Sequence, residues 1–243
     1  MDAGSTDIHV LSTLGLGFFL GIKHAFDADH IIAVSTLTTE RKGFWNSSLI
    51  GMVWGVGHTS SLLVVGLLVV LLGLQIPESV SQWMEFSVAL MLIVLGVNTL
   101  WKLHRGAVLH AHDHEHGQHR HRHPHLHEHG LEEHTLPNHH PVKLGTKPFI
   151  VGVVHGLAGS AALMLLILTT ISSKLLALIY IAVFGCGSLG GMFVMTAAMS
   201  VPFSIVSNHK RLNHHIRQSA GIISVVFGLF IAWQIAFLQG GLF

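Results

Sequence analysis

Long apolar runs, separated by short polar segments, make up most of this chain. A helix that crosses the hydrocarbon core of a bilayer needs about 20 mostly apolar residues. Runs of this length lie at residues 10–36, 47–74, 83–103, 148–171, 174–200 and 219–239. The pattern therefore predicts an all-α fold, a polytopic membrane bundle of six transmembrane helices.

The composition is typical of a protein that is surrounded by lipid. Of 243 residues, 50% are hydrophobic and only 10% are charged, whereas about a quarter of the residues in soluble domains are charged. The formal net charge of +1 gives no indication of a surface that binds nucleic acid. Cys186 is the only cysteine, which excludes an internal disulfide framework and a cysteine-rich zinc module.

One long polar segment divides the chain into two three-helix halves, residues 1–103 and 148–243, joined by a loop at residues 104–147. The loop carries histidine at nearly every second position from His110 to His129. We expect it to be disordered without metal, because it is too polar to bury a core. Its imidazoles would bind nickel, zinc, cobalt or copper, with an affinity that falls as they protonate below about pH 6.5. It is either a buffer for imported or exported metal or a solvated linker.

Basic residues orient the predicted bundle. They gather in the first, third and fifth loops, at Arg41, Lys42, Lys102, Arg105, Arg120, Arg122, Lys143, Lys147, Lys210, Arg211 and Arg217. The positive-inside rule then places both termini outside and the histidine-rich loop in the cytoplasm. We expect a multi-pass protein of a bacterial inner (plasma) membrane, and the first apolar run, which no basic segment precedes, to be a retained helix.

The two halves show a weak internal repeat. Gly-Ile-Lys-His at 21–24 matches Gly-Val-Val-His at 152–155, and Gly-Val-Gly-His-Thr at 55–59 resembles Gly-Cys-Gly-Ser-Leu at 185–189. Halves of three spans each must have opposite orientations in the membrane. The pattern predicts a 3+3 inverted repeat, with a substrate site between the halves at the midplane. A chance alignment of glycine-rich apolar helices is the alternative.

Ionisable residues interrupt the first apolar run. An ionisable side chain at the centre of a membrane helix costs about 2.5–3.5 kcal/mol on insertion scales, so these residues must be paired, hydrated or bound to an ion. At 100° per residue, His24, Asp27 and His30 share one face of a helix, whereas Asp29 points away unless the helix is unwound. Lys23 lies four residues before Asp27, so Asp27 could instead be its structural ion-pair partner.

Two further histidines lie within apolar runs, His58 in the second and His155 in the fourth. Either could be a metal ligand or a hydrogen-bonded packing residue. The candidate metal ligands are His24, Asp27, Asp29, His30, His58 and His155. Nitrogen and carboxylate ligands without a thiolate suit Ni(II), Co(II) or Zn(II). The alternative is a polar cluster with a purely structural role.

The sequence His-Ala-Phe-Asp-Ala-Asp-His at 24–30 resembles the signature of the nickel/cobalt transporter family, through His24, Asp29 and His30. Gly57-His58-Thr59 resembles that family's second motif. The resemblance implies a secondary permease with these four polar residues in the recognition region. The chain lacks the extra leading helix of family importers, and its fourth run carries His-Gly-Leu-Ala-Gly-Ser in place of their acidic motif. It is closer to the six-span, urease-accessory-like branch.

Together these features predict a permease for Ni(II) or Co(II), with Zn(II) as a further candidate substrate, that works by alternating access. We expect no enzyme activity and no catalytic cofactor, and no nucleotide-binding motif is present. The expected partners are the metal ion, membrane lipid and a cytoplasmic metallochaperone, and the oligomeric state stays open. The alternatives are a related nickel/cobalt efflux protein, a zinc or iron carrier of another family, a membrane metalloenzyme, and a passive sensor or storage protein.

Overall fold

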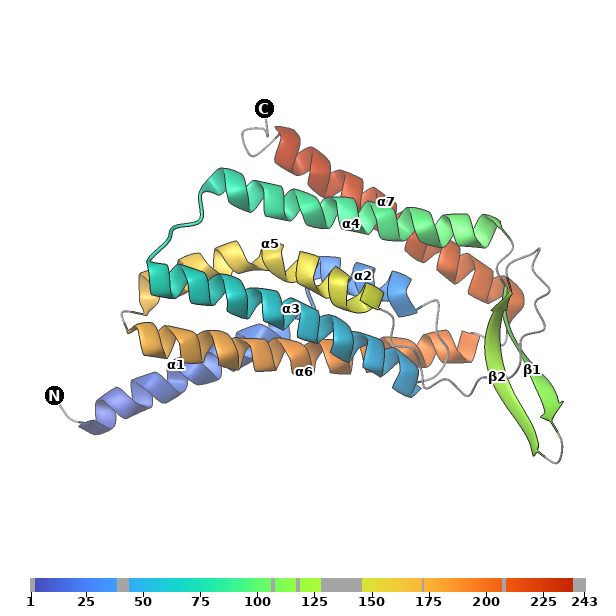
Figure 1. The fold of residues 1–243 in the computed structure, drawn as a ribbon, viewed down its shortest axis with the longest axis horizontal. Coiled ribbons are helices and arrows are strands. Elements are labelled where there is room, and N and C mark those ends of the chain that lie inside the picture. The colour runs from blue at the N-terminus through green and yellow to red at the C-terminus, as the bar shows by residue number, and fades with distance from the viewer. Residues whose placement is uncertain are drawn as a thin grey trace.

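The structure is a computed structural model that describes residues 3–38, 44–105, 108–116, 119–127, 146–171, 173–206 and 209–237 (Figure 1). Its elements are, in chain order, α1 (Ala3–His24), α2 (Ala28–Thr38), α3 (Phe44–Leu72), α4 (Glu78–His104), β1 (Val108–His116), β2 (His119–His127), α5 (Thr146–Thr170), α6 (Lys174–Val206) and α7 (Lys210–Phe237). The predicted helical bundle is confirmed.

Among the residues that the structure describes, four helices are long and apolar enough to cross a membrane, within Ser47–Leu72, Glu78–His104, Lys174–Phe203 and Arg211–Phe237. A fifth span is possible if the bent pair formed by Ile8–His24 and Ala28–Thr38 crosses as one unit. The fourth predicted span corresponds to α5, whose side chains at 160–170 lie outside the described residues. The described residues therefore establish a helical membrane bundle, and the number of six spans stays a prediction.

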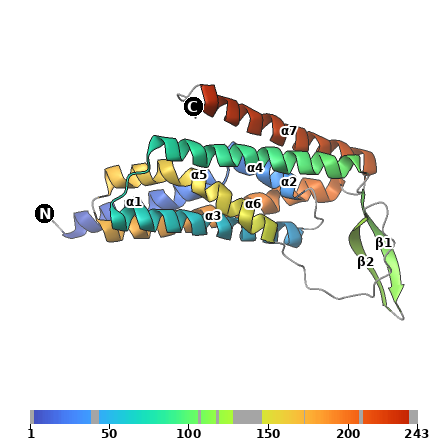
Figure 2. The ribbon, with the colours of Figure 1, turned by 45° about the horizontal axis from the view of Figure 1, so that its top comes forward.

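Helix directions follow from close contacts at glycines. Gly17 lies against Tyr180 and Gly191 against Ala25, so α1 and α6 run parallel. The same reasoning makes α3 and α5 parallel and α4 and α7 antiparallel. These directions alternate as six consecutive crossings require: α1 begins and α7 ends at one end of the bundle, while β1 and β2 lie at the other (Figures 1 and 2).

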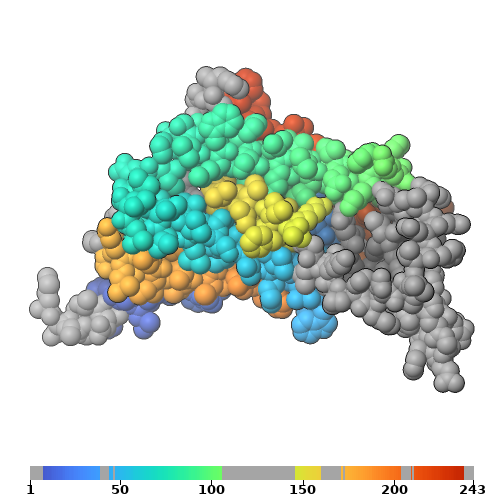
Figure 3. Space-filling model, in the orientation of Figure 1, coloured from blue at the N-terminus to red at the C-terminus, as the bar shows by residue number. Residues whose placement is uncertain are grey.

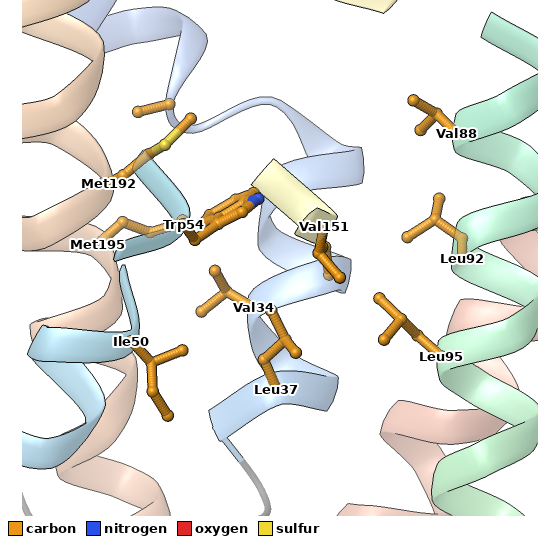
Figure 4. Close-up of a cluster of buried hydrophobic side chains, with 12 residues drawn as sticks. Val34, Leu37, Ile50, Trp54, Val88, Leu92, Leu95, Val151, Met192 and Met195 are labelled. Atoms are coloured by element: carbon orange, nitrogen blue, oxygen red, sulfur yellow. The ribbon is translucent and has the colours of Figure 1, made fainter. Parts of the chain in front are cut away.

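A hydrophobic cluster holds the middle of the bundle together. It combines side chains from five helices, namely Val34 and Leu37 of α2, Ile50 and Trp54 of α3, Val88, Leu92 and Leu95 of α4, Val151 of α5, and Met192 and Met195 of α6 (Figure 4). The described side chains of α5 appear in Figure 3 as a strip between α3 and α4. The cluster therefore anchors α2 and α5, the two elements next to the ionisable residues.

The histidine-rich segment contains an antiparallel pair of strands, β1 and β2. The register sets His110 opposite His125 and His112 opposite His123. Alternation of histidine with other residues has the period of two that a strand requires, whereas the sequence pattern was interpreted only as low complexity. The expected disorder of the loop without metal stays a prediction.

Candidate metal site

The site forms where the first span breaks. α1 ends at His24, α2 begins at Ala28, and the axes of the two helices differ by 51°. Asp27 caps α2, because its carbonyl accepts the first helical bond from Ile31 N–H at 3.1 Å, and aspartate is favoured at this position. The acidic Asp29 in the first turn of α2 also suits the positive end of a helix dipole. The sequence thus ends one helix and starts another inside the bundle.

Three imidazoles from three helices meet at this break. His24 ends α1, His30 lies in the first turn of α2, and His58 lies in the middle of α3. One ligand atom from each lies within 4.8 Å of the others. The ring centroids are 4.7 Å apart for His24 and His30, 5.2 Å for His24 and His58, and 5.1 Å for His30 and His58. This spacing is close enough for one ion to be shared after small side-chain rotations.

The three imidazoles present unused nitrogens to one another. Nε2 of His24, Nε2 of His30 and both ring nitrogens of His58 are buried without a hydrogen-bond partner. An unpaired polar atom removed from water costs free energy, on the order of 1–3 kcal/mol in proteins. A metal ion would satisfy the lone pair of one nitrogen in each ring, since neutral imidazole is the commonest metal ligand among side chains.

Each of two carboxylates holds one of these imidazoles. Nδ1 of His24 lies 2.7 Å from Oδ2 of Asp27, and Nδ1 of His30 lies 3.0 Å from Oδ1 of Asp29. We assign the proton to Nδ1 in both rings, because a carboxylate can only accept. In each ring Nε2 then carries a lone pair that no hydrogen bond uses. Carboxylates orient metal-binding histidines in this way in many proteins.

Asp29 also connects the two halves of the chain. Its Oδ2 accepts a hydrogen bond of 2.8 Å from Nε2 of His155 in α5, and its Oδ1 accepts from His30 N–H at 2.9 Å. Asp29, His30 and His155 form a second group with ligand atoms within 4.8 Å. Their hydrogen bonds already account for that closeness. The group of His24, His30 and His58 has no such explanation and is the better candidate for holding an ion.

All six residues that the sequence predicted lie around this break, but their places differ from a regular helix. Asp29 does not point away, because the helix is unwound before it. Asp27 belongs to neither ligand group, although it contacts His24, and 49% of its side chain is exposed. In the described part of the chain its ion pair is with His24, so the predicted pair of Lys23 and Asp27 is wrong.

Three residues that the sequence motifs did not single out line the site. The Trp54 ring lies 5.3 Å from that of His30, and the Phe184 ring lies 5.6 Å from that of His24. A methyl group at Gly159 would lie 3.3 Å from Nε2 of His24, so this glycine leaves the space beside a free ring nitrogen open. Aligning the two halves further would have placed Gly159 opposite Ala28, at the break.

Comparison with known proteins shows similarity over almost the whole chain. The profile of the family described as "High-affinity nickel-transport protein" matches residues 10–236. The urease accessory protein UreH of Bacillus sp. (strain TB-90) is 36% identical over 233 residues, 96% of this chain and 96% of that protein. No solved structure matches the chain.

Two further relatives match this chain over a shorter stretch or at a lower identity. The nickel transporter NixA of Staphylococcus aureus (strain NCTC 8325 / PS 47) is 40% identical over 85 residues, 33% of this chain and 23% of that protein. The Chloroplast protein FOR GROWTH AND FERTILITY 2 of Arabidopsis thaliana is 25% identical over 225 residues, 91% of this chain and 56% of that protein.

Proposed function

The chain belongs to the family of high-affinity nickel-transport proteins and is a membrane permease for nickel or cobalt, and we propose that it binds the ion through His24, His30 and His58. The observation that carries this proposal is the meeting of buried, unpartnered imidazole nitrogens from three helices within 4.8 Å. Imidazole ligands without a thiolate suit Ni(II) and Co(II), and they also suit Zn(II).

The carboxylates supply the charge that a dication needs in this setting. Asp27 and Asp29 each touch an imidazole of the site, so together they offset two positive charges without contacting the ion. A divalent ion held only by neutral imidazoles would keep its two positive charges in a medium of low dielectric constant, so nearby carboxylates lower its free energy. The same negative charge disfavours anions, which fits a cation permease.

Transport would follow from exposing this site to one side of the membrane at a time. The break between α1 and α2 lies between the two halves, where secondary transporters bind their substrates. For two inward-moving charges, a membrane potential of 100 mV supplies about 4.6 kcal/mol, so the potential is a sufficient driver for uptake. We place the termini outside and the histidine-rich loop in the cytoplasm, where it would receive the ion and pass it to a metallochaperone.

The histidine-rich loop is equally compatible with one second candidate, efflux of the same ions. A polyimidazole segment at the cytoplasmic mouth would collect metal for export as readily as it would receive imported metal. The two directions differ in which side of the membrane must supply the ion, and a flux measurement separates them.

The test is flux of Ni(II), Co(II) and Zn(II) into sealed proteoliposomes under an imposed potential. We expect wild type, His9→Ala and a variant lacking residues 110–140 to admit nickel, and His24→Ala and His58→Ala to lose most of the flux. His9 is an exposed histidine on α1 far from the break, so His9→Ala is the matched control. Full flux in both His24→Ala and His58→Ala would overturn the site, and flux only out of the vesicles would establish efflux.

A further inference from the structure

Close contacts at glycines relate the two halves of the chain to each other. A methyl group at Gly21 of α1 would overlap the carbonyl oxygen of Phe184 and approach Ser188 N to 2.9 Å on α6. The contact recurs in the other half, because a methyl group at Gly152 of α5 would overlap the carbonyl oxygen of Trp54 and approach His58 N to 3.0 Å on α3. The pairing of α1 with α6 therefore repeats in the pairing of α5 with α3.

The relation extends to the remaining helices. A methyl group at Gly96 of α4 would lie 2.6 Å from Gly221 O and 2.9 Å from Val225 N of α7. One at Gly228 of α7 would lie 2.7 Å from Ala89 O and 3.1 Å from Ile93 N of α4. These reciprocal contacts support the predicted inverted repeat.

The same relation assigns a counterpart to each residue of the site. His24 corresponds to His155, and their aromatic neighbours correspond too, since His24 lies 5.6 Å from Phe184 and His155 lies 5.7 Å from Trp54. His58 of α3 corresponds to Ser188 of α6. The His58 ring lies 5.2 Å from that of His24 and 5.9 Å from that of His155. The repeat relation therefore predicts that Ser188 faces the same pair of histidines from the opposite helix.

Ser188 differs from the other buried hydroxyl residues of the described helices. It is 0% exposed, and of the described buried hydroxyl groups its oxygen is the one without a hydrogen-bond partner. On the same helix, Thr196 donates to Met192 O at 2.6 Å and Ser200 donates to Ala197 O at 2.7 Å, as serine and threonine in helices commonly do. An oxygen that is buried without such a bond indicates a partner outside the chain.

We propose that Ser188 holds a water molecule bound to the transported ion, on the side of the site opposite His58. This inference rests on the proposed binding of the ion by His24, His30 and His58. Three imidazoles leave coordination positions open on Ni(II) or Co(II), and a serine side chain is too short to reach as far as the histidine that it replaces in the repeat. A bridging water would span the remaining distance between the serine oxygen and the ion at little energetic cost. The ion would therefore enter the site with part of its hydration shell.

The test compares Ser188→Ala with Ser200→Ala in purified protein. Ser200 is also buried on α6 but already bonds to the backbone, so it controls for the loss of a buried hydroxyl. We expect Ser188→Ala to weaken the binding of Ni(II) and Co(II) about tenfold, the usual size of an effect on groups that support metal ligands, and Ser200→Ala to leave it unchanged. Binding is measured by isothermal titration calorimetry.

Cobalt spectroscopy supplies a readout that a loss of packing would not change. Loss of a bound water lowers the coordination number, so Ser188→Ala should intensify the visible absorption of bound Co(II). In wild type, water enriched in oxygen-17 should broaden the electron paramagnetic resonance signal of Co(II), which needs no variant to fold. Equal affinity in the two variants, or a wild-type signal without broadening, overturns the role of Ser188. Wild type that binds neither metal overturns the proposed site itself.

Discussion

At the scale of single residues, the two carboxylates of the site differ in burial and in the number of groups they hold. Asp29 has 30% of its side chain exposed and accepts hydrogen bonds from two imidazoles on different helices. Asp27 is about half exposed and accepts from His24 alone. Asp29 therefore fixes both the orientation of His30 and the position of α5, whereas Asp27 fixes one ring. Replacing Asp29 should therefore weaken metal binding more than replacing Asp27.

We expect Asp29→Asn to weaken nickel binding by about 10- to 100-fold and Asp27→Asn to weaken it less, because an amide that replaces Asp29 cannot accept from both imidazoles. Calorimetric titration of nickel into the purified variants measures both effects. Glu78→Gln, at the exposed start of α4, is the control for loss of a carboxylate. A larger effect at Asp27 than at Asp29 would contradict this ordering.

Gly159 tests whether the space beside His24 is occupied during transport. A methyl group there would lie 3.3 Å from Nε2 of His24, without meeting any backbone atom within 4 Å. We expect Gly159→Ala to reduce nickel flux at least severalfold while the unfolding temperature changes little. Gly190→Ala is the control, because a methyl group at Gly190 meets nothing within 4 Å. Unchanged flux in Gly159→Ala would show that the ion does not use this space.

At the scale of helices, the pairs α1 with α6 and α3 with α5 depend on contacts between backbones. Gly21 and Gly152 each face a carbonyl oxygen of the neighbouring helix so closely that no side chain fits. Small residues allow such approaches in membrane helices, where packing rather than the hydrophobic effect drives association. These contacts also set the height of His24 relative to α6 and the height of His155 relative to α3.

Substitution of alanine at either glycine should therefore push a helix pair apart. We expect Gly21→Ala and Gly152→Ala each to destabilise the protein by about 1–3 kcal/mol, the usual cost of overpacking. Thermal unfolding in detergent, followed by circular dichroism, measures the loss. Gly15→Ala on α1 is the control, since a methyl group at Gly15 has open space around it. A stability equal to that of Gly15→Ala would mean that the helices shift at no cost.

At the scale of the whole molecule, basic residues at the end of α4 lie far from the start of α1 and the end of α7. Lys102 and Arg105 lie at the end of α4 nearest β1, while α1 begins and α7 ends at the other end of the bundle (Figure 1). By the positive-inside rule, this arrangement predicts how the protein is oriented in the membrane. The end that carries β1 and β2 should face the cytoplasm.

Labelling of single cysteines in intact cells tests this orientation. In a Cys186→Ala background, a membrane-impermeant thiol reagent should label Thr6→Cys directly and Gln118→Cys only after lysis. The background itself is the control, because Cys186 is the only cysteine of the chain. Labelling of Gln118→Cys in intact cells would invert the assigned topology.

The sequence pattern could predict the helical membrane bundle and the residues that gather at the break between α1 and α2, but not the part that each of those residues plays in the candidate site. The motif around His24 and His30 identified the site, since ionisable side chains in an apolar run need partners. The roles of Asp27 and Asp29 depend on the break between α1 and α2, which changes the angular positions that a regular helix would give. The repeat alignment includes Ser188, and its extension places Gly159 opposite Ala28, but neither residue was given a role, because the contacts on which those proposed roles rest join the two halves of the chain.

The two halves agree in their contacts but differ in one element. The first breaks after His24, whereas its counterpart α5 continues as one helix through His155 and Gly159. If the halves exchanged shapes, α1 and α2 would straighten and α5 would bend at the corresponding position. Nearly the same contacts would then be made in both conformations, so their free energies would be close, as a carrier that returns empty requires. The structure, with α1 and α2 bent and α5 straight, would then represent one conformation of the transport cycle. The other conformation would be its inverted image, with α5 bent and α1 and α2 straight.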